Sequence, residues 1–320
     1  MNGRVCGAVR GARCGARGPR GVERCQGESP AIVAIGVAGA TGALDGRRGD
    51  MSNARRPGRE LGVHVTLRLE EDRGVARRPE ELRAAARILH AQGRSRGLLA
   101  FRVADTHVHV VLASPRERAG EFARYAASAL KQGLRLPVSF EPARFQSITQ
   151  VKHLHHAVRY AIRQESHHGT DFDPAHDGSS VPDLLGLRDL RDIGATPELL
   201  PRLRLLLPRV TARDLEQWAD LPPIGDIQPD PTLLRDAAAA AFGLSSLHGN
   251  DPTHVLARIA AVHAVSLPSP LVARILGTSP RAVQRWRRLA PAPEHVRLVQ
   301  RQLRLRTALR ARAPTWIPTP

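Results

Sequence analysis

Two histidines one residue apart, in the apolar run His107-Val108-His109, are the first residues of the sequence whose types and spacing suggest chemistry. An extended chain points residues i and i+2 to the same face of a sheet, so both imidazoles would project side by side. Neutral imidazole is a common ligand of divalent metal ions. Such a pair is often only two half-buried, hydrogen-bonded side chains. Its position after a tight turn, on a strand with an apolar opposite face, favours a metal site.

A tyrosine and a glutamine follow downstream at helical spacing. Tyr160 and Gln164 are four residues apart, so in a helix they lie one turn apart on a shared face. Arg159 and Arg163 flank the tyrosine and could hold phosphate, while the Gln164 amide oxygen could reach a hard cation. The sequence has one other tyrosine, Tyr125, which lies in an alanine-rich amphipathic segment and is expected to pack.

These parts together indicate attack of a tyrosine on a phosphodiester. A phenol has a pKa of roughly 10, so it must lose its proton as it attacks. A divalent cation polarises a phosphate oxygen and makes the phosphorus electrophilic. Attack by Tyr160 would leave a 5′ phosphate on the tyrosine and free a 3′-OH, which is a covalent intermediate suited to strand transfer.

The elements that must position these residues can be read from the hydrophobic pattern. Strands are expected over 63–69 and 98–103 and across the two histidines, with a short strand or irregular segment over 140–148. Helices are expected over 79–92, 115–133 and 151–165. This order predicts an α+β fold, an antiparallel sheet with helices on one face.

Composition indicates a polyanionic partner. The chain has 320 residues, which suggests about two domains, and a formal net charge of +18. Its only lysines are Lys131 and Lys152, so arginine carries nearly all of the positive charge. The planar guanidinium pairs well with phosphate, which favours nucleic acid over a membrane. A GC-rich genome also enriches arginine, but it does not explain the excess over acidic residues.

Export and membrane insertion are not indicated. The three cysteines, Cys6, Cys14 and Cys25, match no zinc spacing and form no disulfide framework. The apolar segment 31–40 is too short to span a bilayer. We therefore expect a cytoplasmic protein with no membrane partner, either a monomer or a homodimer.

Composition also divides the chain. Residues 1–55 are rich in Gly, Arg and Ala and are expected to be a disordered basic segment, unless the start codon is misassigned and translation begins at Met51. Residues 60–170 form the α+β domain, and 171–195, with Asp, Gly, Ser and Pro, are expected to be a linker. An all-α domain is expected over 196–313.

The all-α domain contains a predicted helix-turn-helix over 269–288. Ala273 lets two helices approach, Gly277 supplies the turn, and Val283 and Trp286 point to the core. The outward residues are expected to contact duplex DNA in the major groove, although a helical hairpin with a solvated basic face is the alternative. These residues are Arg281, Gln284, Arg285, Arg287 and Arg288.

Three short motifs in residues 62–169 carry a family resemblance. The opening strand 62–68, the pair His107-Val108-His109 and the helix bearing Tyr160 together resemble the single-tyrosine HUH transposases, in particular the branch associated with repetitive extragenic palindromes. Their HUH fold is a ferredoxin-like sheet. The helix-turn-helix resembles, more weakly, the DNA-binding domain of the bacterial replication initiator.

The resemblance implies a set of roles. Tyr160 would be the nucleophile, and His107, His109 and Gln164 would bind Mg²⁺ or Mn²⁺. The substrate would be single-stranded or hairpin DNA. The sequence leaves two alternatives open: a domesticated descendant that binds DNA without cutting it, and a metal-free 2H phosphoesterase acting on RNA ends, suggested by the His64-x-Thr66 pattern.

Overall fold

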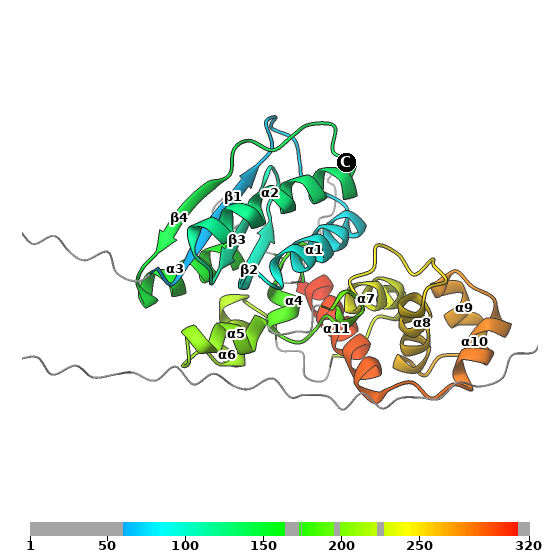
Figure 1. Cartoon of the computed structure of the whole chain (residues 1–320). Coiled ribbons are helices and arrows are strands. Elements are labelled where there is room, and N and C mark those ends of the chain that lie inside the picture. The colour runs from blue at the N-terminus through cyan, green and yellow to red at the C-terminus, as the bar shows by residue number, and fades with distance from the viewer. Residues whose placement is uncertain (1–59, 164–172, 174, 195–198, 223–226, 313–320) are drawn as a thin grey trace, which may run out of the picture. The chain divides into compact units, whose positions relative to one another are not determined.

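The computed structural model describes residues 60–163, 173, 175–194, 199–222 and 227–312. Four strands form one antiparallel sheet in the order β2-β3-β1-β4 (Figure 1). The strands are β1 (Gly62–Arg68), β2 (Leu98–Val103), β3 (His107–Leu112) and β4 (Arg144–Ile148). The α+β class with an antiparallel sheet is therefore confirmed. The predicted 1–55 segment lies outside the described residues.

Alternation along the strands gives the sheet two different faces. Val63, Val65 and Leu67 of β1 are at most 1% exposed and form one apolar face with their neighbours on β3. His64 and Thr66 point to the other face, because successive side chains of a strand alternate. The polar face is the one that carries the candidate chemistry.

Helices cover both faces of the sheet, whereas the sequence predicted helices on one face. On the apolar side lie α1 (Pro79–Gly93) and α2 (Arg116–Gly133), side by side in Figure 1. On the polar side lies α3 (Val151–Ile162), whose Leu154, Ala157, Val158 and Ala161 are buried. The difference arises because α3 has an apolar stripe of its own, which needs the second face of the sheet.

A helical region follows the sheet, as predicted. Its helices are α4 (Val181–Leu184), α5 (Leu199–Leu206), α6 (Ala212–Trp218), α7 (Leu234–Ala241), α8 (Pro252–Ala264), α9 (Ser269–Leu276), α10 (Pro280–Arg287) and α11 (Pro293–Arg312). Helices α7 to α11 share an apolar core rich in alanine. Of the helices in the described ranges, none is long and apolar enough to cross a membrane.

The described part of the predicted linker, residues 175–194, is largely buried. Its backbone bonds to β2 on one side, where Val103 N donates to Gly178 O at 2.8 Å. On the other side Asp189 N donates to Ala241 O at 2.8 Å, and Gln302 Nε2 donates to Leu187 O at 2.8 Å. The polar residues that indicated a linker are thus largely buried and have partners distant in the sequence.

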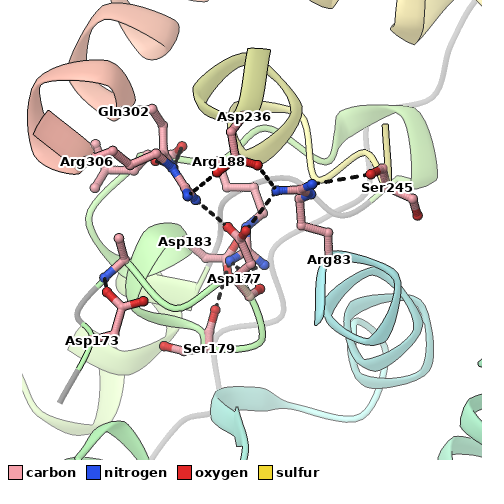
Figure 2. A network of polar contacts seen from close by, with 12 residues as sticks. Arg83, Asp173, Asp177, Ser179, Asp183, Arg188, Asp236, Ser245, Gln302 and Arg306 are labelled. Atoms are coloured by element: carbon pink, nitrogen blue, oxygen red, sulfur yellow. Dashed lines mark hydrogen bonds and ion pairs between the residues drawn. The ribbon is translucent and has the colours of Figure 1, made fainter. Parts of the chain in front are cut away.

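A ring of four charged side chains joins the sheet to the helical region (Figure 2). Arg83 of α1 donates to Asp177 at 2.9 Å and to Asp236 of α7 at 2.7 Å. Arg306 of α11 donates to the same two carboxylates, at 2.6 and 2.7 Å. The Asp177 and Arg83 side chains are only 3% and 5% exposed, so each needs its partners to remain charged in the interior.

A second buried carboxylate lies beside the ring. Asp183 is 3.0 Å from His90 Nε2 and 3.6 Å from Arg188 Nη1. Burial alone would raise the pKa of Asp183, but the charges of Arg188 and His90 outweigh it and lower the pKa. The lowered pKa therefore favours the ionised form of Asp183 in the contact between the sheet and the helices.

Candidate functional site

The polar face of the sheet gathers histidines from two neighbouring strands. In the β1–β3 register Thr66 lies opposite His109, and Arg68 lies opposite His107. His64 Nε2 is 3.0 Å from His109 Nδ1, and their rings stack with centroids 5.1 Å apart. The rings of His107 and His109 are 4.6 Å apart, which confirms that both project from the same face.

Hydrogen bonds hold the Nδ1 atom of each predicted metal ligand. Thr106 Oγ1 lies 3.1 Å from His107 Nδ1, and Thr66 Oγ1 lies 3.4 Å from His109 Nδ1. A neutral imidazole that donates through Nδ1 has its lone pair on Nε2. In that tautomer Nε2 would be the atom of each ring that binds a metal.

Helix α3 places Tyr160 over this cluster. The Tyr160 ring is 5.3 Å from that of His109, at 87°, and 5.9 Å from that of His64. Its side chain is 36% exposed, so the phenol is accessible from solvent although the ring packs on the histidines. Tyr160 thus forms one site with histidines that lie from about fifty to nearly a hundred residues earlier in the sequence.

A buried arginine fixes the end of α3. Arg102 of β2 is fully buried and lies opposite His109 in the β2–β3 register. Its guanidinium donates to Ile162 O, in the last turn of α3, at 3.1 Å. Cations favour helix C-termini, where backbone carbonyls lack helical partners. Arg102 therefore holds the segment that carries Tyr160 against the sheet, a role that sequence patterns do not reveal.

His107 and His109 could supply two of the ligands that a divalent cation needs. Among the described residues no group of three His, Cys, Asp or Glu side chains could hold a metal, so the two histidines would need ligands of another type. Gln164, the predicted third ligand, lies outside the described residues. Metal-binding histidines usually donate their other ring N–H to a carboxylate, a carbonyl or water. Here the contacts at Nδ1 of His107 and His109 come from the Thr106 hydroxyl and the His64 ring.

Burial favours the neutral form of His64, at the edge of the cluster next to β4. Burial lowers the pKa of His64, a hydrogen bond to Gln146 raises it, and the charge of His153 lowers it, with a net lowering. Gln146 lies opposite His64 in the β1–β4 register. The lowered pKa favours the neutral ring of His64 in the site. From the sequence, His64 was singled out only as part of the His64-x-Thr66 pattern of the 2H alternative.

The solvent face of α3 is basic around the tyrosine. Lys152 and His156 are exposed about two turns and one turn before Tyr160, and Arg159 is exposed directly before it. Arg163 follows the helix and is half-buried. Basic side chains beside the Tyr160 phenol are suited to contact the phosphate groups of a nucleic acid.

The predicted helix-turn-helix has the expected burial. Gly277 ends α9 with a φ of 64°, a left-handed conformation that glycine adopts without strain. Val283 is fully buried, and Trp286 is 6% exposed. Ser279 caps α10 by accepting a hydrogen bond from Ala282 N at 3.2 Å.

The outward side chains of α10 differ in what they contact. Arg281, Gln284, Arg285 and Arg288 are exposed and line one surface depression together with the helix cap. Arg287 is exposed as well, but its guanidinium donates to Ser269 Oγ at 3.1 Å and to Leu267 O. Arg287 therefore ties α10 to the start of α9.

Comparison with known proteins does not assign the chain to a family. No protein-family model and no curated protein matches the chain. Among solved structures, a REP-associated tyrosine transposase bound to a REP hairpin is similar over 37% of this chain and 75% of that chain. The identity is 21% and the TM-score 0.29, values too low to support any functional argument.

Proposed function

We propose that the chain is a DNA-nicking and strand-transfer enzyme of the transposase kind, with Tyr160 as nucleophile. One observation supports this most: the phenol lies against the His109 ring, 5.3 Å between centroids, on the face that also carries His107. A packed core tyrosine would be covered, whereas Tyr160 keeps 36% of its surface in solvent. The basic face of α3 beside it suits a single-stranded or hairpin DNA.

The proposed step conserves the phosphodiester bond energy. The Tyr160 oxygen attacks phosphorus, the P–O3′ bond breaks, and the 5′ phosphate stays on tyrosine. The phenol proton leaves to solvent and the departing 3′ oxygen takes up a proton. A 3′-OH of another strand can then reverse the step, which joins the two strands without water or an external energy source.

His107 and His109 would hold Mg²⁺ or Mn²⁺ through Nε2, with Gln164 as the proposed further ligand. When bound, such a cation would polarise a phosphate oxygen and orient the scissile bond. The chain's own contribution is to fix the two rings through Nδ1, to hold α3 through Arg102, and to keep the phenol at the surface.

The test is a covalent-adduct assay. Wild-type protein is incubated with labelled hairpin single-stranded DNA and Mn²⁺, and denaturing gels are run with and without protease. A protease-sensitive, covalently labelled protein band supports the proposal. Binding without any adduct, across hairpins of varied sequence, would instead support the domesticated DNA-binding alternative.

Loss of one histidine should remove the proposed metal site. We expect His107→Ala or His109→Ala, singly, to abolish cleavage and to weaken Mn²⁺ binding, because one ion needs both imidazoles. Isothermal titration with Mn²⁺ and the adduct assay measure the two effects separately. His248→Ala, at an exposed histidine of the helical region, is the matched control and should behave like wild type. Full cleavage in both variants, or in EDTA, would contradict the metal role.

The 2H phosphoesterase remains the second candidate. His64 and Thr66 lie on β1 directly beside the β3 pair, which is also the arrangement that two histidine motifs of such an enzyme would need. That reaction needs no metal and no tyrosine. Activity on RNA ends that persists in EDTA and in Tyr160→Phe would favour it.

For α10 we propose contact with duplex DNA through Arg281, Gln284, Arg285 and Arg288. Their exposure on one helix face, above the buried Val283 and Trp286, supports this. Arg287, engaged with Ser269, would contribute mainly to holding the two helices together.

The double variant Arg281→Ala/Arg285→Ala should weaken duplex binding and make it less dependent on salt. Each phosphate contact contributes about −0.9 to the log–log salt slope. If either arginine reads a guanine edge, its loss should cost about 1–3 kcal/mol on the preferred site and less elsewhere. Fluorescence anisotropy at several salt concentrations measures both. An unchanged slope and affinity would mean that α10 is structural.

Point variants of α10 test its DNA binding more directly than deletion of residues 196–320 would. Deletion would remove Asp236 and Arg306 and leave Arg83 and Asp177 of the charged ring incompletely paired. It would also remove Arg202, which donates to Leu98 O of β2 at 2.9 Å. A truncated chain would therefore test folding together with DNA binding.

A further inference from the structure

We propose that a groove between α2 and the segment 139–145 binds bases of a single-stranded DNA, on the face of the sheet opposite Tyr160. This rests on the proposed function, because it takes single-stranded DNA as the substrate and adds a second place where the protein holds it. The groove has a volume of about 580 Å³. That volume lies within the range of roughly 300–1,000 Å³ that is usual for ligand pockets.

Small residues of α2 form one wall of the groove. Gly120, Ala123 and Ala127 are three or four residues apart, so they share one face of the helix. A Cβ added at Gly120 would meet nothing within 4 Å apart from its chain neighbours and the helix backbone. Leu67 of β1, which is 1% exposed, also lines the groove. This wall is apolar and carries no large side chain, which leaves room for a planar group.

Aromatic side chains line the opposite wall. Phe140 and Phe145 are half-buried, packed against the core on one side and lining the groove on the other. The guanidinium of Arg116 lies over the Phe145 ring, 4.0 Å from its centroid. Aromatic rings with an arginine beside them are the features on which the bases of single-stranded nucleic acids stack.

The aromatic wall is held by the backbone of β1 and the residues after it. Glu141 N donates to Arg68 O at 2.8 Å, and Glu70 N donates to Ser139 O at 3.1 Å. These bonds flank Phe140, so the groove is formed in the chain without a ligand.

Cationic side chains border the groove. Arg124 and Lys131 line it from α2. An acidic side chain, Glu141, lines it as well, but it lies 3.6 Å from Arg144 and 4.0 Å from Arg68, so its charge is offset. A basic border around an aromatic wall complements the charged backbone and the flat bases of a single-stranded DNA.

Strand β4 connects the groove with the face that carries Tyr160. It is the outermost strand in the order β2-β3-β1-β4. Phe145 faces the groove, whereas Arg144, directly before it, lies opposite Thr66 on the polar face. A single strand can therefore pass round this edge of the sheet, with bases in the groove and a phosphate at Tyr160.

The first experiment measures binding of oligothymidylate to the full chain by fluorescence anisotropy. The probe has about eight nucleotides, within the usual site size of about 4–16. We expect Gly120→Leu to bind it about 5- to 150-fold more weakly, the equivalent of one lost base stack. Gly120→Ala should have a smaller effect, because a methyl group takes up less of the groove.

The control for this experiment is Gln132→Leu, at an exposed residue of α2 that does not line the groove. It should bind like wild type. Leucine is a better helix former than glycine, so Gly120→Leu should keep the fold. Equal affinity of Gly120→Leu and wild type for oligothymidylate would overturn the proposal.

The second experiment locates the bound strand in wild-type protein. Oligothymidylate that carries iododeoxyuridine is crosslinked by light, and the attached peptides are identified by mass spectrometry. We expect crosslinks within residues 139–145, and their loss in Phe145→Leu, which keeps an apolar side chain against the core. Crosslinks confined to α3 or α10 would overturn the proposal, even if Gly120→Leu did not fold.

A second copy of the chain is another occupant that these variants would reveal. Sedimentation of wild type and Gly120→Leu measures the oligomeric state. A wild-type dimer that dissociates in Gly120→Leu, with oligothymidylate affinity unchanged, would assign the groove to self-association and overturn the proposal.

Failure of the proposed function would look different. A wild-type chain that forms no DNA adduct, while Gly120→Leu loses oligothymidylate affinity and the crosslinks fall in 139–145, removes the nuclease and keeps the groove. An active chain whose crosslinks avoid 139–145 and whose affinity ignores Gly120→Leu does the reverse.

Discussion

Tyr160→Phe is expected to abolish the covalent protein–DNA adduct while hairpin binding changes by less than about threefold. The substitution removes only the phenolic oxygen, and the ring can keep its contacts with His109 and His64. Without that oxygen no phosphotyrosine can form, so the loss should be complete and not graded. Adduct yield on denaturing gels and hairpin affinity by anisotropy measure the two quantities on the same preparation.

The matched control is Tyr125→Phe. The sequence has two tyrosines, and Tyr125 is 45% exposed on α2, the helix that covers the opposite face of the sheet. Arg96 and Arg124 lie over its ring at 5.2 and 4.8 Å. Tyr125→Phe should therefore react like wild type. An adduct that survives in Tyr160→Phe and disappears in Tyr125→Phe would exchange the roles of the two residues.

Asp177→Ala is expected to lower the free energy of unfolding by about 3–5 kcal/mol, the usual cost of removing one partner of a buried ion pair. Its carboxylate is 3% exposed and accepts from both Arg83 and Arg306. Without it Asp236 is the one carboxylate of the ring that remains for the two guanidiniums. Urea unfolding followed by circular dichroism at neutral pH measures the loss.

Asp72→Ala is the control for that experiment. Asp72 pairs with Arg68 at 2.8 Å, but the two side chains are 84% and 45% exposed. Surface pairs of this kind contribute about 0–1 kcal/mol, because water solvates both charges. A loss for Asp177→Ala no larger than that for Asp72→Ala would show that the ring of Arg83, Asp177, Asp236 and Arg306 stabilises the fold no more than a surface pair does.

Local patterns predicted the elements of the site well. The strand Leu98–Val103 and the turn at Gly277 appear as the sequence indicated, since alternation and glycine chemistry are local signals. The shared face of His107 and His109 follows from strand geometry alone. That these histidines lie beneath Tyr160 required the family resemblance, because no local pattern relates residues so far apart.

Long-range register determined what the sequence did not reveal. His64 contacts His109 only because β1 pairs with β3 in one particular alignment, and a shift by one residue would turn it to the apolar face. The content of Asp, Gly, Ser and Pro in residues 171–195 predicted a linker, but Asp177, Ser179 and Asp183 are buried. Their burial depends on Arg83, Arg188 and Arg306, which a reading of neighbouring residues cannot pair with them.

The ring of Arg83, Asp177, Asp236 and Arg306 has a consequence for the substrate. It joins α1, on the sheet, to α7 and α11, against which the helix-turn-helix packs through α8. If α10 binds duplex DNA and Tyr160 cuts a single strand, the ring would keep these two sites at a fixed separation. The cut would then fall a constant number of nucleotides from the duplex edge, whatever the sequence of the intervening bases.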